Sequence, residues 1–371
     1  MRKIISRLTI SCFALLMTTT ACNSQVVYTE YEPASPGIRI MGRTMVSQDG
    51  DVEFDWPGIT ITANFTGTAC AMKMDDTGHN WYNVFLDDQP VRVIEVYSDT
   101  TMIIAENLED QEHSLTITKR TEGFQGKATF KGLLIDSEGS ILPHPASHSA
   151  KKIEFIGNSI TCGYGADSYD RFEDFKPETE NNYHSYASIM ARAFGAETHI
   201  VAHSGQGVVR NYGYEKPVSP YVMPDRYMQV FDMQKEPLWD FSKWQPDLVV
   251  INLGTNDFST HPHPGETVFN KGYMNLIKTV REIYDSVPVF CVVGPMTNEP
   301  CYSYVKKMVE ANRNFLGDER VYFVGIPTYL MIEEEDLGAG MHPNYPGHIK
   351  MAQHVAPVIA SVMGWDYGKL E

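Results

Sequence analysis

The sequence predicts a two-domain protein in which an antiparallel β-sandwich precedes an α/β domain with a parallel sheet. Short alternating strands separated by turns run from about residue 46 to residue 137, which is typical of a sandwich. From Lys152 onward, continuous apolar runs alternate with amphipathic helical segments, as in a doubly wound sheet that helices cover on both faces. With 371 residues, 43% of them hydrophobic, the chain is long enough for two cores.

The N-terminus has the pattern of an export signal. Three basic residues precede an apolar stretch, Ile10–Met17, that is too short to span a bilayer. The sequence TTAC then places Cys22 after small residues, which resembles a bacterial lipoprotein cleavage box. We therefore expect residues 1–22 to be a signal peptide, either with lipidation at Cys22 or with ordinary cleavage nearby. The mature chain is then exported, to the periplasm or, as a lipoprotein, to the outer membrane or cell surface.

Charge and cysteine content exclude several classes of protein. Removal of residues 1–21 takes away three basic and no acidic residues and changes the formal net charge from −17 to −20. A chain this acidic is not expected to bind nucleic acid or an anionic membrane surface, so a lipid anchor would be its one link to a membrane. The four cysteines beyond Cys22 form no CxxC motif, which argues against a zinc ribbon. Cys291 and Cys301 could pair, although buried free thiols are the simpler interpretation.

We assign the sandwich domain to residues 23–145. GITITANF alternates Ile59, Ile61 and Ala63 with polar residues, as a half-buried strand does. NVFLDDQPVRVIEVYSD predicts two strands around a turn, and HSLTITKRTE and ATFKGLLID follow at short spacing. The stretch 137–152, rich in Ser, Pro and His, is the predicted linker.

The second domain is assigned to residues 150–371. Runs such as DLVVINLG and VPVFCVVG are expected for parallel strands that are buried on both faces. The predicted strands are 152–156, 197–202, 247–253, 288–294 and 320–324. The predicted helices are 183–194, 266–285, 302–315 and 346–363. In such sheets, sites form beyond the carboxyl ends of the strands.

Four polar stretches follow these strands or precede the last helix: GNSIT, HSGQG, GTND and MHPNYPGH. Together they supply the groups that acyl transfer needs. Ser159 is the predicted nucleophile and His342 the predicted general base. The backbone N–H groups of Ser159 and Gly205 and the side-chain amide of Asn256 are predicted to form the oxyanion hole. Ser204 is a rival nucleophile that ranks below Ser159.

Other polar residues have weaker patterns. The histidines of HPHP at 261–264 and of MHPNYPGH lack carboxylates at metal-binding spacing, so no metal is expected. Tyr164 and Tyr345 are candidate substrate-binding residues, although most tyrosines pack in cores. Asp257 is expected to brace a loop or cap a helix and not to act as a catalytic acid.

The order of the four polar blocks, over about residues 150–371, resembles the SGNH or GDSL hydrolase superfamily. With its β-rich front and the matches GNSITCGYG and HPN…GH, the chain is most similar to carbohydrate esterase family 2, the acetylxylan esterase type. The resemblance implies a flavodoxin-like three-layer α/β/α domain preceded by a jelly-roll sandwich. It further implies a serine carboxylic ester hydrolase that removes acetyl groups from plant polysaccharides such as xylan and glucomannan through an acyl-enzyme, at an open site without a cofactor. The alternatives are another SGNH esterase or thioesterase, and a non-catalytic glycan-binding lipoprotein.

The sequence departs from the superfamily pattern just before His342. Many SGNH enzymes place an Asp two or three residues before the His, where this chain has Gly340 and Ala339. We expect a backbone carbonyl near Gly340, or else Glu335 or Asp336 folding back, to orient the imidazole. With a carbonyl as partner, the pKa of His342 is expected to stay near its unperturbed value of about 6.5.

Overall fold

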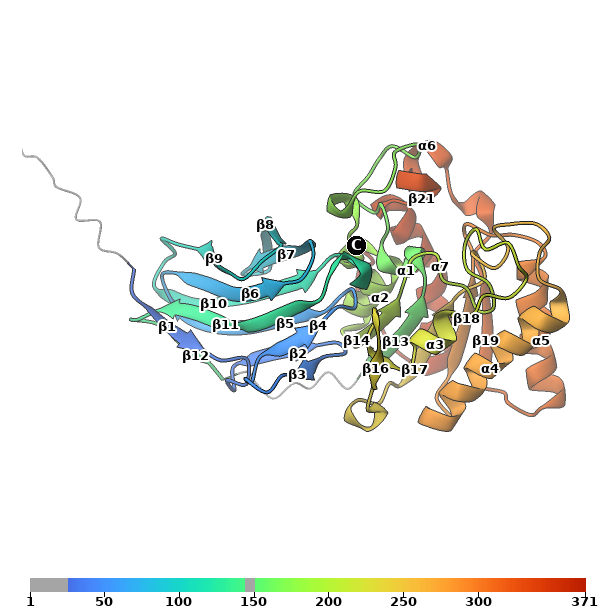
Figure 1. Cartoon of the computed structure of the whole chain (residues 1–371), viewed down its shortest axis with the longest axis horizontal. Helices are drawn as coiled ribbons and strands as arrows, with labels where there is room; N and C mark the ends of the chain where they lie inside the picture. The colour runs from blue at the N-terminus through green and yellow to red at the C-terminus, as the bar shows by residue number, and fades with distance from the viewer. Residues whose placement is uncertain (1–25, 144–150) are drawn as a thin grey trace, which may run out of the picture.

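The structure, a computed structural model, describes residues 26–143 and 151–371 and contains a sandwich domain beside an α/β domain (Figure 1). The predicted signal peptide with Cys22 and residues 144–150 of the predicted linker lie outside the described residues. Within those two ranges, no helix combines the length and the apolar character that a bilayer crossing requires.

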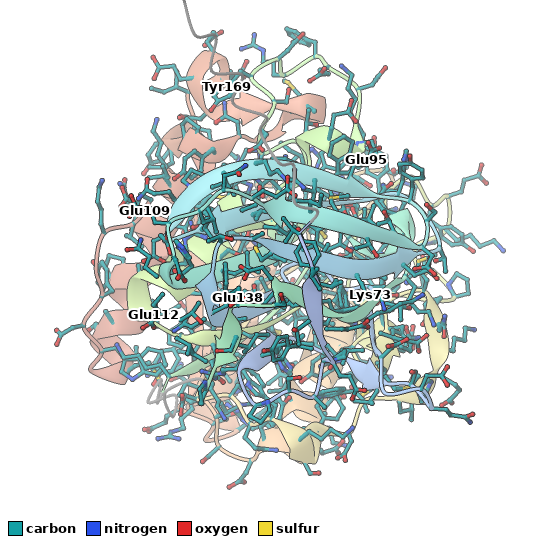
Figure 2. The ribbon with its side chains drawn as sticks, turned by 90° about the vertical axis from the view of Figure 1, so that its left-hand side faces the viewer. Lys73, Glu95, Glu109, Glu112, Glu138 and Tyr169 are labelled. Atoms are coloured by element: carbon teal, nitrogen blue, oxygen red, sulfur yellow. The ribbon has the colours of Figure 1, made fainter. Side chains whose placement is uncertain are left out.

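The sandwich is built from antiparallel strands: β1 Tyr28–Tyr31, β2 Ile38–Met41, β3 Met45–Val46, β4 Val52–Phe54, β5 Thr60–Gly67, β6 Cys70–Asp76, β7 Asn80–Leu86, β8 Gln89–Val96, β9 Thr100–Ala105, β10 Gln111–Lys119, β11 Ala128–Asp136 and β12 Ser140–Leu142. One sheet has the order β3-β4-β11-β6-β9 with β1 beside β11, and the other has the order β12-β5-β10-β7-β8 with β2 beside β5. Their inner faces enclose one apolar core, to which β5 contributes Ile61, Ala63 and Phe65. Charged side chains such as Lys73 and Glu112 cover the end of the domain that faces away from the α/β domain (Figure 2).

Strand β12 lies inside the stretch that was predicted to be linker. That prediction is wrong for Ser140–Leu142, because these residues extend the second sheet by pairing with β5. Ile141 lies opposite Phe65 in this pairing. A strand of three residues is too short to give a periodic signal in the sequence.

The α/β domain contains a parallel sheet formed by β13 Lys152–Gly157, β14 Glu197–Ala202, β17 Leu248–Asn252, β18 Val289–Val293 and β19 Val321–Gly325. The strand order is β14-β13-β17-β18-β19, the flavodoxin-like order. Helices α2 Tyr186–Phe194 and α7 Tyr345–Met363 cover one face of the sheet, and α4 Glu266–Tyr284 and α5 Cys301–Phe315 cover the other. The predicted fold class is confirmed, and each predicted strand and helix of this domain ends within three residues of the observed one.

Short elements complete the domain, and the sequence analysis did not predict them. They are α1 Ser159–Cys162, α3 Met223–Arg226, β15 Gln229–Phe231, β16 Gln234–Leu238, α6 Glu333–Asp336, β20 Leu337–Gly338 and β21 His342–Pro343. Short 3₁₀ helices lie at Gly123–Gln125, Pro177–Thr179, Asn182–His184, Phe241–Lys243, Thr328–Leu330 and Ala339–Met341. The four described cysteines are buried free thiols, as the simpler interpretation predicted.

Buried polar side chains of the sandwich join it to the α/β domain. Arg43, in the loop after β2, forms an ion pair with Glu154 of β13 at an N···O distance of 3.0 Å, and both side chains are 0% exposed. The Arg43 guanidinium also donates to two backbone carbonyl groups of the α/β domain. Trp56 enters the core beside the parallel sheet and donates to the carbonyl of Val230 at 2.7 Å. A shift of one domain that broke the ion pair of Arg43 and Glu154 while the interface stayed closed would leave a buried charge without its partner.

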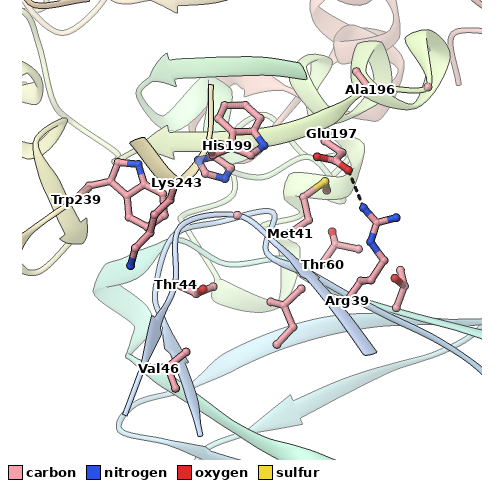
Figure 3. Close-up of a pocket in the computed structure, with 15 residues that line it drawn as sticks. Arg39, Met41, Thr44, Val46, Thr60, Ala196, Glu197, His199, Trp239 and Lys243 are labelled. Carbon is pink, nitrogen blue, oxygen red and sulfur yellow. Dashed lines mark hydrogen bonds and ion pairs between the residues drawn. The ribbon is translucent and has the colours of Figure 1, made fainter. Parts of the chain in front are cut away.

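A cavity of about 560 Å³ opens on the seam between the domains (Figure 3). In its wall, His199 stacks on Trp244 with ring centroids 3.8 Å apart. An ion pair between Arg39 and Glu197, 2.7 Å long, crosses the seam at the edge of this cavity. The Arg39 side chain is 40% exposed, so water screens this pair.

We expect the variant Arg43→Met to lower the free energy of unfolding by about 3–5 kcal/mol, because it leaves the buried carboxylate of Glu154 without its charge partner. The matched control is Arg39→Met, which removes a solvated pair across the same seam and should cost less than about 1 kcal/mol. Urea denaturation followed by tryptophan fluorescence measures both variants. Equal effects would contradict the importance assigned to the Arg43 pair.

Candidate active site

Ser159 lies at the carboxyl end of β13 and begins the short helix α1. The turn into α1 is tight: a Cβ atom at Gly157 would lie 2.0 Å from the hydroxyl oxygen of Thr161, so glycine is required there. Asn158 caps the helix, since its side-chain oxygen accepts the N–H of Ile160 at 3.1 Å. This strand–turn–helix geometry holds the Ser159 hydroxyl at the edge of the sheet.

His342 faces the Ser159 hydroxyl. Its Nε2 atom lies 2.8 Å from the Oγ atom of Ser159, and its Nδ1 atom lies 3.1 Å from the carbonyl oxygen of Gly340. A carbonyl oxygen only accepts, so Nδ1 carries the proton and Nε2 is free to accept the hydrogen of the serine hydroxyl. Of the groups expected to orient the imidazole, the geometry matches the backbone carbonyl.

The turn at 339–341 brings this carbonyl to the imidazole. Gly340 and Met341 both adopt the left-handed backbone conformation, with φ of 58° and 62°. Met341 is strained there, because a side chain disfavours this conformation. The N–H groups of Gly340 and Met341 donate to the carbonyls of Glu173 and Arg171 at 2.9 and 3.1 Å, and these bonds hold the turn.

Neither nearby carboxylate reaches the imidazole. Asp336 is buried, and its carboxylate pairs with the Lys350 ammonium at 2.5 Å and accepts the N–H of Ile332 at 2.6 Å. The side chain of Glu335 is exposed. The alternative in which one of these residues orients His342 is therefore wrong for this structure, because α6 directs both side chains elsewhere.

Burial lowers the pKa of His342 to about 4, and the hydrogen bond to the Gly340 carbonyl opposes this shift without cancelling it. The ring of Tyr164 stacks on the imidazole with centroids 4.1 Å apart and shields it from water. The expected pKa of about 6.5 is therefore wrong. The carbonyl is a weak partner for the imidazolium, and the loss of hydration on burial favours the neutral ring more strongly.

Gly205 and Asn256 line the same cavity as Ser159, which has a volume of about 560 Å³. Gly205 follows β14 with φ of +76°, a conformation that favours glycine, and its carbonyl accepts the N–H of Tyr212 at 2.8 Å. Asn256 follows β17, and its amide nitrogen donates one hydrogen to the carbonyl of Gln206 at 2.8 Å. The amide nitrogen carries a second hydrogen, which it can donate to a group bound in the cavity.

Asp257 braces the loop after Gly205, one of the two roles expected for it. Its buried carboxylate accepts the backbone N–H groups of Val208, Val209 and Arg210 at 2.9, 2.8 and 2.9 Å. Burial raises the pKa of Asp257 to about 6, although these hydrogen bonds act in the opposite direction. The carboxylate is fully occupied by the loop.

The two candidate substrate-binding tyrosines lie in different places. Tyr164 lines the Ser159 cavity, whereas Tyr345 stacks on His184 at a centroid distance of 4.0 Å and lines a separate cavity of about 990 Å³. Tyr345 is therefore not brought into the site, because its ring packs on His184 and does not line the Ser159 cavity. His348 is wholly buried and accepts the N–H of Tyr186 at 3.2 Å, a structural role.

Sequence reasoning missed the other residues that line the cavity: Tyr212, Thr255, Phe258, Ser259, Met296 and Thr297. They lie on loops after β14, β17 and β18, where no periodic pattern marks the residues that face inward. Tyr212 is 72% exposed and has a ring at the rim that a sugar could contact.

In the part of the chain that the structure describes, one group of three side chains is close enough to share a metal ion. It consists of Glu122, Cys162 and Glu180, whose ligand atoms lie within 4.8 Å of one another. None of the histidines considered in the sequence belongs to it. His261 and His263 stack on each other at 3.9 Å.

Two family descriptions match consecutive parts of the chain. Residues 40–145 match "Carbohydrate esterase 2 N-terminal", and residues 155–349 match "GDSL-like Lipase/Acylhydrolase family". The first covers most of the sandwich, and the second extends from β13 into α7.

Characterised proteins and solved structures resemble the chain across both domains. It is 37% identical over 339 residues to the cellulase/esterase CelE of Acetivibrio thermocellus, a match that covers 89% of this chain but only 40% of CelE. It is 26% identical over 335 residues to an acetylxylan esterase / glucomannan deacetylase of Cellvibrio japonicus, covering 90% of each. A family two carbohydrate esterase from Clostridium thermocellum, solved in complex with cellohexaose, has a TM-score of 0.83 and 36% identity, covering 89% of this chain and 100% of that one. The chain therefore belongs to carbohydrate esterase family 2, with a catalytic domain of the GDSL-like lipase/acylhydrolase family.

Proposed function

We propose that the protein is a carbohydrate O-acetyl esterase that removes acetyl groups from plant polysaccharides such as xylan and glucomannan. The observation that carries the proposal is the hydrogen-bonded chain from the Ser159 hydroxyl through His342 to the carbonyl of Gly340, at the edge of an open cavity. The relative named acetylxylan esterase / glucomannan deacetylase supports the substrate class. The relative solved with cellohexaose supports a β-linked oligosaccharide as ligand.

The reaction follows from the positions of these groups. The Oγ atom of Ser159 attacks the carbonyl carbon of the acetyl ester while Nε2 of His342 takes the hydroxyl proton. Negative charge develops on the carbonyl oxygen of the ester. The N–H groups of Ser159 and Gly205 and the side-chain amide of Asn256 stabilise this charge. The imidazolium then gives its proton to the sugar oxygen, so the ester C–O bond breaks and an acetyl group remains on Ser159.

The second half of the reaction regenerates the enzyme. A water molecule attacks the acetyl carbon while His342 takes one of its protons. The bond between the acetyl group and Ser159 breaks, the serine oxygen recovers the proton from the imidazolium, and acetate leaves. The Gly340 carbonyl carries only a partial charge, so it stabilises the imidazolium less than an aspartate would.

We expect Ser159→Ala to lower the rate of acetate release by on the order of 10⁴-fold or more while the protein stays folded, because binding and oxyanion stabilisation alone remain. Acetate released from acetylated xylan and from acetylated glucomannan is measured for both proteins. Ser188→Ala is the matched control, since Ser188 lies on α2 and bonds Asn182, away from the cavity. Near wild-type turnover by Ser159→Ala would disprove the nucleophile, and a wild type inactive on both polymers would disprove the substrate class.

The pH profile tests the environment of His342. Because its pKa is lowered to about 4, kcat/KM should rise with pH through that region and then stay level to neutral pH. Between about pH 6.5 and 4 the unfolded chain takes up a proton that the folded His342 does not, so stability should fall as pH falls through this window. An inflection of kcat/KM near pH 6.5 would show a hydrated imidazole. Glu335→Gln is the control and should leave the profile unchanged.

We propose that the chain is exported and held at a membrane by a lipid on Cys22. The support is the basic and apolar leader followed by TTAC. Cys22→Ala should move the protein from the membrane fraction to the soluble fraction, as detected by immunoblotting. A wild-type protein that is already soluble would leave simple export as the correct interpretation.

A further inference from the structure

A carboxylate of the sandwich domain, that of Glu122, contacts the loop that lines the candidate active site. Glu122 lies three residues beyond β10 and is wholly buried. One of its carboxylate oxygens accepts the backbone N–H of Ser204 at 2.6 Å, and the other accepts the Ser204 hydroxyl. Ser204 directly precedes Gly205, and the peptide group between them carries the Gly205 N–H. The Glu122 side chain of the sandwich therefore holds the residue of the α/β domain that sets the direction of this N–H. These contacts also make Ser204 unsuitable as the rival nucleophile.

The position of Glu122 is itself fixed. The ammonium group of Lys119, also wholly buried, donates to the backbone carbonyls of Thr121 and Glu122 at 2.6 and 3.4 Å. The backbone N–H of Glu122 donates to a carboxyl oxygen of Glu180 at 3.2 Å. The segment therefore has anchors on both domains and little freedom to move.

The charge of this cluster favours strong bonds to Ser204. Burial raises the pKa of Glu180 well above its usual value, and the charge of Glu122 raises it further. This shift favours the neutral form of the Glu180 carboxyl, which reduces its repulsion with the neighbouring Glu122 carboxylate. Burial also keeps the Cys162 thiol neutral by raising its pKa. Hydrogen bonds to a charged acceptor are stronger than those between neutral groups, and a buried site strengthens them.

Other contacts hold the two flanks of the Gly205 loop. On one side, the Nδ1 atom of His203 lies 2.6 Å from the carboxylate of Asp232. On the other side, Asp257 binds the backbone at 208–210, beyond Gly205. Between these flanks, Glu122 is the carboxylate that anchors the residue next to Gly205.

We propose that Glu122 is a positioning residue for the oxyanion hole, which it serves by fixing Ser204 and thereby the direction of the Gly205 N–H. The sandwich domain is on this basis a structural part of the catalytic site. The inference rests on the proposed esterase function, in which the Gly205 N–H donates to the carbonyl oxygen of the ester as negative charge develops there. Its consequence is that loss of Glu122 should impair the transition state more than the binding of substrate.

The experiment compares Glu122→Ala with wild type in steady-state hydrolysis of 4-nitrophenyl acetate and in inhibition by ethylboronic acid, which forms a tetrahedral adduct with a serine hydroxyl. Glu122→Ala should lower kcat by about 10²-fold with KM nearly unchanged, as expected when a catalytic group is misplaced. The inhibition constant of the boronic acid should rise by a similar factor, because its adduct needs the same donors. Glu122→Gln, which keeps an accepting oxygen, should lose no more than about tenfold in kcat.

Two reference variants complete the test. Asn256→Ala removes an oxyanion donor and should weaken the boronic acid in the same way, with a loss of about 10²–10³ in kcat. Arg39→Met breaks a cross-domain ion pair remote from Ser159 and should change neither kcat nor the inhibition constant. If it changed both, domain contact in general, and not Glu122, would be responsible.

The outcomes separate this inference from the proposed function. A wild type without esterase activity would remove the proposed function, whereas an active wild type with unchanged kcat in Glu122→Ala would overturn only the role of Glu122. A lower kcat with an unchanged boronic acid constant would overturn it as well. If Glu122→Ala does not fold, as judged by circular dichroism, Ser204→Ala decides: its kcat should fall by about tenfold at constant KM, and an unchanged kcat would reject the inference.

Discussion

The buried ion pair between Arg43 and Glu154 fixes the sandwich against the parallel sheet. Glu154 lies on β13, the same strand that ends next to Ser159, and both charged side chains are closed off from water. Because a buried charge without its partner is costly, the two domains keep one relative position. Trp56 and Glu122 enter the α/β domain at the same seam, so their contacts are held in place as well. The sandwich thus belongs to the structure around the site and is not an independent appendage.

The strand order of the sheet explains how the site assembles. Strand β13 lies between β14 and β17, and the residues Ser159, Gly205 and Asn256 follow these three adjacent strands. All three strands run in parallel, so their carboxyl ends meet at one edge. His342 arrives from a later loop, and its orientation depends on a backbone carbonyl that a left-handed turn at Gly340 presents.

In the proposed mechanism, the lowered pKa of His342 gives the oxyanion hole a larger part in catalysis. A base whose pKa is lowered to about 4 is neutral over a wide pH range, but it draws the serine proton less strongly than a more basic imidazole. Stabilisation of the developing oxyanion then carries a larger share of the lowering of the barrier. The proposed support of the Gly205 N–H by Glu122, which acts through Ser204, and the hydrogen bonds from the following loop to Asp257 agree with this division.

The sequence by itself determined the family, which the comparisons confirm, and the strands and helices of the α/β domain, because apolar periodicity and the polar blocks at strand ends are local patterns. Burial and contact between distant residues belong to the tertiary structure. The lowered pKa of His342 and the position of Tyr345 on His184 could not be read from neighbours in the chain. The bond between Glu122 and Ser204 joins residues 82 positions apart and on different domains, so only the packing of the sandwich against the sheet decides that they meet.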